Sequence, residues 1–410
     1  MLRSLNSGVA GLRNHQERLD TIGNNIANVN TAGFKADRVT FEEAFNQTLE
    51  SATAPNDRGG TNPQQIGLGM NIGSMDTIHT QGSLENTGRR TDLAIEGDGF
   101  FTVNDGESDY FTRVGNFGVD SDGNLVSQST GYKVQGYQVD EDGGIDTDEM
   151  GDIEVPLGDV VSPKATENVS YRGNLDSKTE EEDSVTTTVD VYDALGGKHT
   201  IDVTFTKQEG NEWEVEFSYE DENGNQETVE ADDNLTFDNN GEIKDGEIAN
   251  LNLDLGDDVE DLEIEFDLSN ITQYSDGDGN STVEGTVEDG RQQGDLEDFG
   301  INAAGVVTGI YSNGETRELG QITMADFSNP AGLNKEGSGL YTPSQNSGEP
   351  RFGIAGSGGR GEIRPGALEM SNVDMSQEFT DMIVTQRGFQ ANSRTISTGD
   401  EVLQELVNLK

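Results

Sequence analysis

The side chains in this sequence that could do acid–base chemistry are almost all carboxylates. The chain holds 79 Asp and Glu residues, three histidines and no cysteine. Two neighbouring carboxylates can act as acid and base, as they do in glycoside hydrolysis. With so many acids, however, close pairs arise by chance and do not indicate a catalytic site. The lack of cysteine excludes disulfides, thiolate metal sites and cysteine nucleophiles.

Two segments, starting at Asp120 and at Asp276, begin like the calcium loop of an EF-hand. That loop needs glycine at its sixth position and glutamate at its twelfth. The first segment has Leu125 and Gly131 at these positions, and the second segment also departs from the pattern at both. Both are better explained as hairpin turns, in which Asp-Gly and Gly-Asn pairs supply positive φ angles. We therefore expect no metal site.

The remaining candidates for chemistry are isolated. His15, His79 and His199 stand in segments of different character, so they do not suggest a shared site. The Gly97-Asp-Gly99-Phe sequence lacks the third glycine and the helix of a dinucleotide site. The sequence therefore predicts a protein with no active site and no cofactor, which is not an enzyme.

Charge restricts the partners of the chain. A net charge of -54 would repel the phosphates of nucleic acids and an anionic membrane surface. No apolar run approaches the roughly 20 residues of a membrane span, so we expect no membrane insertion. Such acidity is typical of disordered chains, but alternating strand patterns run through the acidic part. We expect instead a folded protein with a carboxylate surface, as in a halophilic source where salt screens the repulsion.

Both ends of the chain carry apolar residues at the three- and four-residue spacing of a helix face. The first stripe spans residues 2–29 and the second runs through the last forty residues. Polar Gln386, Ser393 and Asp400 occupy some positions of the second stripe. Neither stripe can be buried alone, so the two helices either pair within one chain or also pack against neighbouring copies. The interrupted seam and the small net charge of both ends favour many partners around one axis.

The middle of the chain predicts β structure. Residues 72–165 and 299–365 contain short alternating runs separated by Asp-Gly turns. Residues 176–298 hold 39 acidic and 5 basic residues, a net charge of -34, yet strands such as EWEVEFSYE remain legible there. Alternation of apolar residues with Glu, Asp or Thr suits a sheet with one buried face. Between them and the first helix, residues 31–71 predict an irregular linker with one short helix near Phe41–Phe45.

Several motifs, taken in order, resemble the bacterial flagellar rod and hook family. They are GNNIANVNTAGFK at 23–35, LAIEGDGFF at 93–101, GALEMSNVD at 366–374 and MIVTQRGFQANS at 382–393. The asparagines after the first helix alone would be explained by an ordinary helix terminus, where Asn and Gly suit a left-handed cap. The ordered set at both ends makes the resemblance specific, and it covers about residues 1–140 and 300–410.

The resemblance implies a multidomain α+β protein, mainly β. Its terminal helices pair as a coiled-coil-like domain, and all-β domains are nested between them. The expected domains are 1–30 with 372–410 as the inner tube, 31–71 with 366–371 as a connecting region, 72–165 with 299–365 as a β domain, and 166–298 as the outermost acidic insertion.

The function implied is that of a structural subunit of the extracellular hook, polymerising helically into the flexible tube that couples rod to filament for motility. Implied partners are further copies, the rod, the hook cap, the hook–filament junction proteins and the flagellar type III export apparatus. That route would account for an N-terminus without a signal-peptide apolar block. The long insertion and the LVNLK ending favour a hook over a distal rod protein, and a secreted carbohydrate-active enzyme is the alternative from another class.

The stripes and the motifs together predict an assembly interface. It comprises Leu2, Leu5, Val9, Leu12, Leu19, Ile22, Asn24, Asn25, Ile26, Asn28, Val29, Phe34, Phe379, Met382, Gln386, Arg387, Phe389, Asn392, Ile396, Leu403 and Val407.

Overall fold

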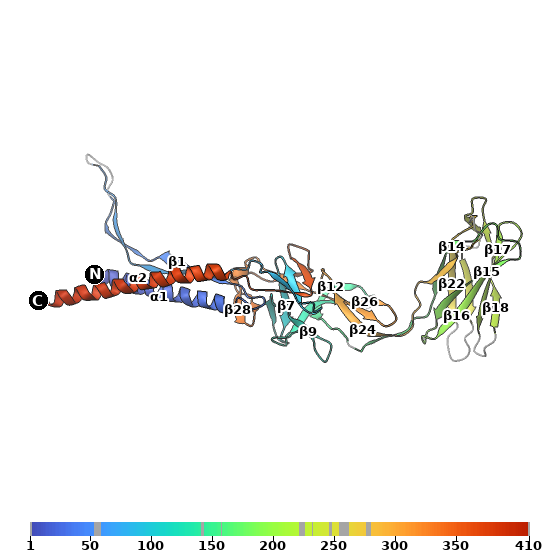
Figure 1. Ribbon diagram of the computed structural model, residues 1–410, viewed down its shortest axis with the longest axis horizontal. Helices are drawn as coiled ribbons and strands as arrows, with labels where there is room; N and C mark the ends of the chain where they lie inside the picture. Colours follow the sequence, from blue (N-terminus) through green and yellow to red (C-terminus); the bar gives the residue numbers. More distant parts are fainter. Residues whose placement is uncertain are drawn as a thin grey trace. The chain divides into compact units, whose positions relative to one another are not determined.

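The computed structural model describes residues 2–52, 59–140, 143–156, 158–220, 226–231, 233–245, 248–253, 262–275 and 280–408. Its long helices are α1 (Leu2–Ala27) and α2 (Met375–Asn408), one at each end of the chain (Figure 1). A short 3-10 helix covers Pro330–Gly332, and the other regular elements are strands. The prediction of a mainly β protein with two terminal helices is confirmed. Neither described helix has the apolar length needed to cross a bilayer.

The strands are short and numerous. Before residue 166 they are β1 (Asp37–Glu43), β2 (Asn46–Glu50), β3 (Gln64–Gly67), β4 (Met70–Thr77), β5 (Leu84–Asn86), β6 (Leu93–Glu96), β7 (Phe100–Asn104), β8 (Asp109–Thr112), β9 (Phe117–Val119), β10 (Leu125–Ser127), β11 (Lys133–Val139), β12 (Ile145–Asp152) and β13 (Val160–Val161). From there to residue 293 they are β14 (Asn168–Asn174), β15 (Ser184–Tyr192), β16 (Lys198–Lys207), β17 (Glu212–Glu220), β18 (Gln226–Glu230), β19 (Leu235–Phe237), β20 (Ile243–Asp245), β21 (Ile248–Leu253), β22 (Leu262–Thr272) and β23 (Glu284–Val287). The remainder are β24 (Gly294–Ile301), β25 (Val306–Tyr311), β26 (Thr316–Ile322), β27 (Met324–Asp326), β28 (Asn334–Gly337), β29 (Leu340–Thr342), β30 (Arg351–Gly353), β31 (Glu362–Pro365) and β32 (Ala367–Glu369).

The chain forms two compact units, and each is described here by itself. The first comprises Met1–Pro156, Phe299–Gly309 and Arg317–Lys410, and therefore contains both long helices. The second comprises Leu157–Asp298 and Ile310–Thr316, and contains the whole acidic segment 176–298.

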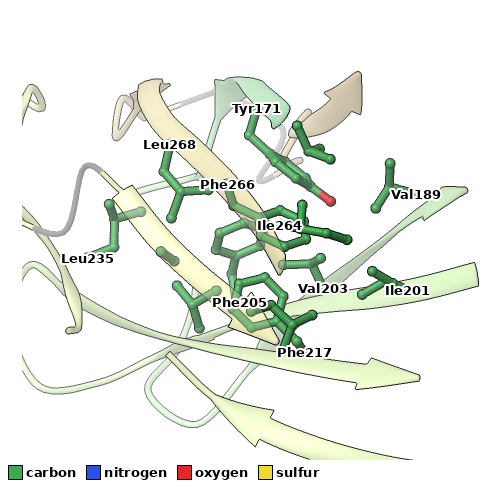
Figure 2. Packing of buried hydrophobic residues seen from close by; sticks show 14 of the residues in the cluster. Tyr171, Val189, Ile201, Val203, Phe205, Phe217, Leu235, Ile264, Phe266 and Leu268 are labelled. Atoms are coloured by element: carbon green, nitrogen blue, oxygen red, sulfur yellow. The ribbon is translucent and has the colours of Figure 1, made fainter. Parts of the chain in front are cut away.

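The second unit is built from two packed sheets. One has the strand order β21-β22-β14-β23, and the other has β15-β16-β17-β19-β20 with β18 on β17. Along β16, β17 and β22 buried residues alternate with more exposed ones, because every second side chain of a strand points to the same face. Tyr171, Phe205, Phe217 and Phe266 meet in the resulting core (Figure 2), where the rings of Phe217 and Phe266 are 4.6 Å apart. A small apolar core therefore supports a surface of carboxylates.

The β part of the first unit has an aromatic core of its own. β7 pairs with β8, β11 and β27, which brings segments far apart in the sequence onto one strand. Phe100, Phe111, Phe327 and Tyr341 form one buried cluster, in which Phe111 and Phe327 meet edge to face at 4.9 Å. Edge-to-face pairs of this kind add stability beyond their buried area.

The segment between α1 and the β core departs from its prediction. The short helix expected near Phe41–Phe45 is wrong, because Phe41 lies in β1, which pairs antiparallel with β4, and Phe45 follows that strand. The pairing continues as β2 with β3, so 37–77 forms a ribbon across the described residues. Asn14 of α1 donates to the carbonyl of Met70 at 2.7 Å, which ties the ribbon to the helix at the start of β4, halfway along its length. A partner remote in sequence thus decided the structure of this segment.

The turn predicted at Asp120 is present between β9 and β10. Oδ1 of Asp120 accepts hydrogen bonds from the backbone N–H groups of Asp122 and Asn124, and Gly123 has a φ of 90°. The carboxylate therefore closes a hairpin, as expected. Most of the corresponding segment at Asp276 lies outside the described residues.

Candidate assembly surface

The two helices pair antiparallel along a seam of small side chains, with N- and C-termini at the same end (Figure 1). The contacts in order are Leu5 with Gly399, Gly8 with Ile396, Gly11 with Asn392, His15 with Gly388, and Arg18 with Asp381. A Cβ at Gly11 would lie 2.4 Å from Nδ2 of Asn392. The glycines of α1, unfavourable in an isolated helix, thus allow close approach of α2.

This seam corrects the position of the second stripe. Gln386, Ser393 and Asp400, which the sequence suggested as polar seam positions, are exposed. The side of α2 that meets α1 instead carries Thr385, which is 1% exposed, and Gly388. These two positions were missed because glycine and threonine carry no apolar signal, whereas the predicted residues Leu5, Asn392 and Ile396 do lie in the seam.

Large apolar side chains remain exposed along α2. They are Met375, Phe379, Ile383, Val384, Val402 and Val407, and Val9 of α1 is exposed as well. Three of them, Met375, Phe379 and Ile383, are spaced four residues apart along the helix.

The residues predicted for the interface fall into three groups. Exposed are Val9, Asn24, Phe379, Gln386, Arg387 and Val407. Partly buried within the chain are Leu5, Leu12, Leu19, Ile26, Asn28, Val29, Phe34, Met382, Phe389, Asn392, Ile396 and Leu403. Ile22 and Asn25 are covered by the chain itself, at 4% and 1% exposure, and the side chain of Leu2 is outside the described part.

Asn25 is a structural residue at the end of α1. Its Nδ2 donates to the carbonyl of Asp37 at 2.8 Å and to Oε1 of Glu378 at 3.0 Å. Its Oδ1 accepts from the backbone N–H of Asp37 at 3.0 Å. Burial is the leading cause that raises the pKa of Glu378. One amide thus joins α1, the start of β1 and the first turn of α2.

A buried ionic cluster lies close to this point. Nζ of Lys35 is 2.6 Å from Oε1 of Glu369, and Nη1 of Arg113 is 3.2 Å from Oε2. All three side chains are at most 3% exposed. Desolvation lowers the pKa of Lys35, and the charge of Glu369 opposes that shift. Buried charges persist only when they are paired and hydrogen-bonded, and further hydrogen bonds satisfy the charged groups of this cluster.

Backbone groups complete the cluster. The N–H of Gly82 donates to Oε1 of Glu369 at 2.8 Å, and Nη2 of Arg113 donates to the carbonyl of Gly97 at 2.8 Å. The side chain of Asn372 bonds to the backbone of Ala36 and Ile78. The chain leaving α1 and the chain entering α2 are therefore fastened to the same β segments. Pattern analysis missed this cluster, although charged Lys35 and Glu369 both lie inside the recognised motifs.

His79 lies beside the cluster. Its ring is 5.6 Å from that of Phe100 and 5.5 Å from that of Tyr341. Burial, together with the charges of Lys35, Arg113 and Lys335, lowers the pKa of His79 to about 4. The imidazole is therefore neutral at ordinary pH.

One group of described carboxylates has the spacing of a metal site. Glu214, Glu216 and Glu230 bring oxygens within 4.8 Å of one another on β17 and β18. These strands carry solvent-facing acids along their length, so the group is explained by the composition of the unit. It does not overturn the expectation of no metal site.

Models of flagellar protein families match four segments. Residues 5–35 match the flagella basal body rod protein, 94–174 the D1 domain of flagellar hook protein FlgE/F/G, 162–290 the D2 domain of flagellar basal body protein FlaE, and 364–409 the C-terminal part of flagellar basal body rod FlgEFG protein. Together the matches reach both terminal helices and both β regions.

Relatives match the whole chain. It is 40% identical to flagellar hook protein FlgE of Borreliella burgdorferi, with 100% of both chains covered, and 34% identical to FlgE of Salmonella typhimurium, with 99% and 100% covered. Flagellar basal-body rod protein FlgG of Bacillus subtilis is 33% identical, with 100% of both chains covered. A solved structure, flagellar hook protein FlgE2 of Helicobacter pylori, matches with TM-score 0.55 at 17% identity, over 70% of this chain and 100% of that one. That last likeness concerns the fold alone.

Proposed function

We propose a set of contacts through which this chain polymerises. The chain belongs to the flagellar hook protein family and is a structural subunit of the bacterial flagellar hook. The paired helices α1 and α2 pack against copies of themselves around one axis and form the inner wall of the tube. The assembly interface predicted above acts in two ways. Its exposed members meet neighbouring copies, and its buried members hold the helix pair in shape.

The observation that carries this proposal is the uncovered apolar surface of α2. Phe379, Ile383 and Val384 are 48%, 52% and 57% exposed, although α2 already packs on α1. Full burial of an exposed side chain of this kind stabilises by about 1.5–3 kcal/mol, so covering the exposed half of each contributes about 1 kcal/mol. In a homopolymer this gain recurs at every subunit.

The acidic unit faces solvent on the outside of the tube. Residues 176–298 carry -34 of the net charge, from 39 acidic and 5 basic residues. By the same count, residues 1–40 hold 5 basic and 3 acidic residues, a net charge of +2. Charge of one sign is least unfavourable where water and salt screen it. We infer a saline habitat for the source.

The partners follow from the position of a hook. The tube continues the rod, grows beneath a hook cap and ends at the hook–filament junction proteins. Its subunits leave the cell through the flagellar type III export apparatus. The family role is structural, and we propose that the chain has no enzymatic activity.

A distal rod protein is the second candidate, because a relative named as a rod protein matches the chain over its full length. Chain length therefore does not distinguish a hook subunit from a rod subunit. Deleting the gene does: a hook subunit leaves intact rods without hooks or filaments, as seen by electron microscopy, whereas truncated rods would identify a rod protein. Complementation with Ile383→Asp should fail to restore hooks, while Gln226→Asp, an equivalent change on exposed β18, should restore them.

A further inference from the structure

The outer half of the ribbon between α1 and the β core is uncovered across its described residues. All described residues of β2 and β3 are exposed, in contrast to β1, where Val39 is buried. Phe45 is 86% exposed, and Leu49, Ile66 and Leu68 are between 39% and 51% exposed. A two-stranded ribbon is marginally stable at best in water unless something covers it.

The apolar residues of this ribbon gather on one face. The N–H of Leu68 bonds to the carbonyl of Phe45, and Gln47 stands opposite Ile66. Directly opposed residues share a face, and alternate residues along a strand do so too. Phe45, Ile66 and Leu68 therefore point the same way, together with Gln47, and the strand register shifts beyond them, at Leu49. The other face carries polar side chains, including Gln65, which bonds to Thr48.

A matching uncovered stripe lies on α2. Met375, Phe379 and Ile383 are 42%, 48% and 52% exposed and stand four residues apart, on the side of the helix away from the seam with α1. Eight residues of helix extend about 12 Å. Four residues of strand, from Phe45 to Leu49, extend about 13 Å. The stripe on α2 and this length of strand are therefore similar in extent.

Charge favours the same pairing. Arg387 follows Ile383 by one helical turn, is exposed, and makes no ion pair within the described part of the chain. The described residues 41–52 and 59–70 of the ribbon include Glu42, Glu43 and Glu50 and no basic residue. A second copy of this chain therefore offers both an apolar stripe and an unpaired cation to the ribbon.

We propose that the Phe45 face of the ribbon in one copy covers the Met375–Ile383 stripe of α2 in a second copy. This contact rests on the proposed function as a polymerising subunit. It assigns a partner to a segment whose described strands, β2 and β3, are exposed along their length, and it links neighbouring subunits outside the helix seam.

Cysteine cross-linking tests the contact, since the chain has no cysteine of its own. A Leu68→Cys variant and an Ile383→Cys variant are mixed, assembled and oxidised, and the mixed dimer is identified by mass. The control mixture uses Gln65→Cys, on the opposite face. We expect at least tenfold more mixed dimer from Leu68→Cys. Tubes that yield equal amounts from both mixtures would overturn the contact. Failure of the unmodified chain to form tubes would instead contradict the proposed function.

A second variant pair tests the same contact without a cross-link. Phe45→Glu should raise the concentration needed for assembly about tenfold, a change equivalent to about 1.4 kcal/mol. Asn46→Glu, on the polar face, should leave it within twofold. Far-ultraviolet circular dichroism of the free subunits should be the same for both. An equal effect of the two variants on assembly would contradict the proposal.

Discussion

The side-chain amide of Asn25 bonds to both backbone groups of Asp37: Nδ2 donates to the carbonyl at 2.8 Å, and Oδ1 accepts from the N–H at 3.0 Å. Asn25 therefore takes the place of a neighbouring strand at the first residue of β1. Because Nδ2 also bonds to Glu378, the end of α1 is fixed relative to the start of α2.

Replacing Asn25 should loosen that junction. Asn25→Asp keeps the acceptor but loses both donated bonds and adds a charge near Glu378. We expect the free energy of unfolding to fall by about 2 kcal/mol, within the range for leaving buried groups unsatisfied. Urea unfolding followed by circular dichroism measures it. Asn24→Asp is the matched control, because exposed Asn24 uses its side chain only as an acceptor from Asn28. Equal losses in the two variants would refute the role given to Asn25.

Removing the charge of Glu369 should have a larger effect. Glu369→Gln leaves Lys35 and Arg113 buried without a counter-ion, and breaking a buried pair in this way destabilises by about 3–5 kcal/mol. The same neutralisation at exposed Glu362 of β31 should change stability by less than about 0.5 kcal/mol. Denaturation of the two variants beside the unmodified chain distinguishes these outcomes. A small loss for Glu369→Gln would mean that the cluster is not a stabilising joint.

The sequence predicted those elements in which apolar and polar residues alternate with a regular local period. The terminal helices and strands such as β17 and β22 follow from periods of 3.6 and 2, and were located to within a few residues. Within the seam, Gly11, Gly388 and Thr385 escaped because they carry no apolar signal, whereas the apolar Leu5 and Ile396 were predicted. The joint of Lys35 with Glu369 escaped because its members are 334 residues apart. Periodicity reports which face of an element is buried, not which distant element covers it.

Acid should weaken the first unit through His79. The folded-state pKa of about 4 lies below the ordinary value of 6.5. The unfolded chain therefore takes up the proton first as the pH falls, and stability decreases between about pH 6.5 and pH 4. The loss from this group amounts to about 3 kcal/mol at most.

The difference between the unmodified chain and His79→Phe isolates this effect, because the many carboxylates titrate in both. The unfolding free energy of the unmodified chain minus that of the variant should fall by up to about 3 kcal/mol from pH 7 to pH 4. If the unfolding free energies of the two chains instead changed in parallel over that range, His79 would be excluded as the cause of the loss of stability in acid.

Assembly should require salt. Neighbouring outer units carry -34 each across residues 176–298, and the screening length falls from about 10 Å at 0.1 M to 3 Å at 1 M. Light scattering of the purified chain should therefore report polymer at high salt and little at low salt. Neutralising Glu214, Glu216 and Glu230 to Gln should lower the salt concentration needed. Equal polymer at low and high salt would contradict the charge argument.

Electron cryomicroscopy of tubes grown from the purified chain tests the central claim most directly. We expect a helical tube whose inner wall consists of α1 and α2, with the exposed apolar side of α2 in contact with other copies and the acidic unit on the outer surface. A tube with the acidic unit on the inside, or one in which Phe379 and Ile383 face solvent, would contradict it.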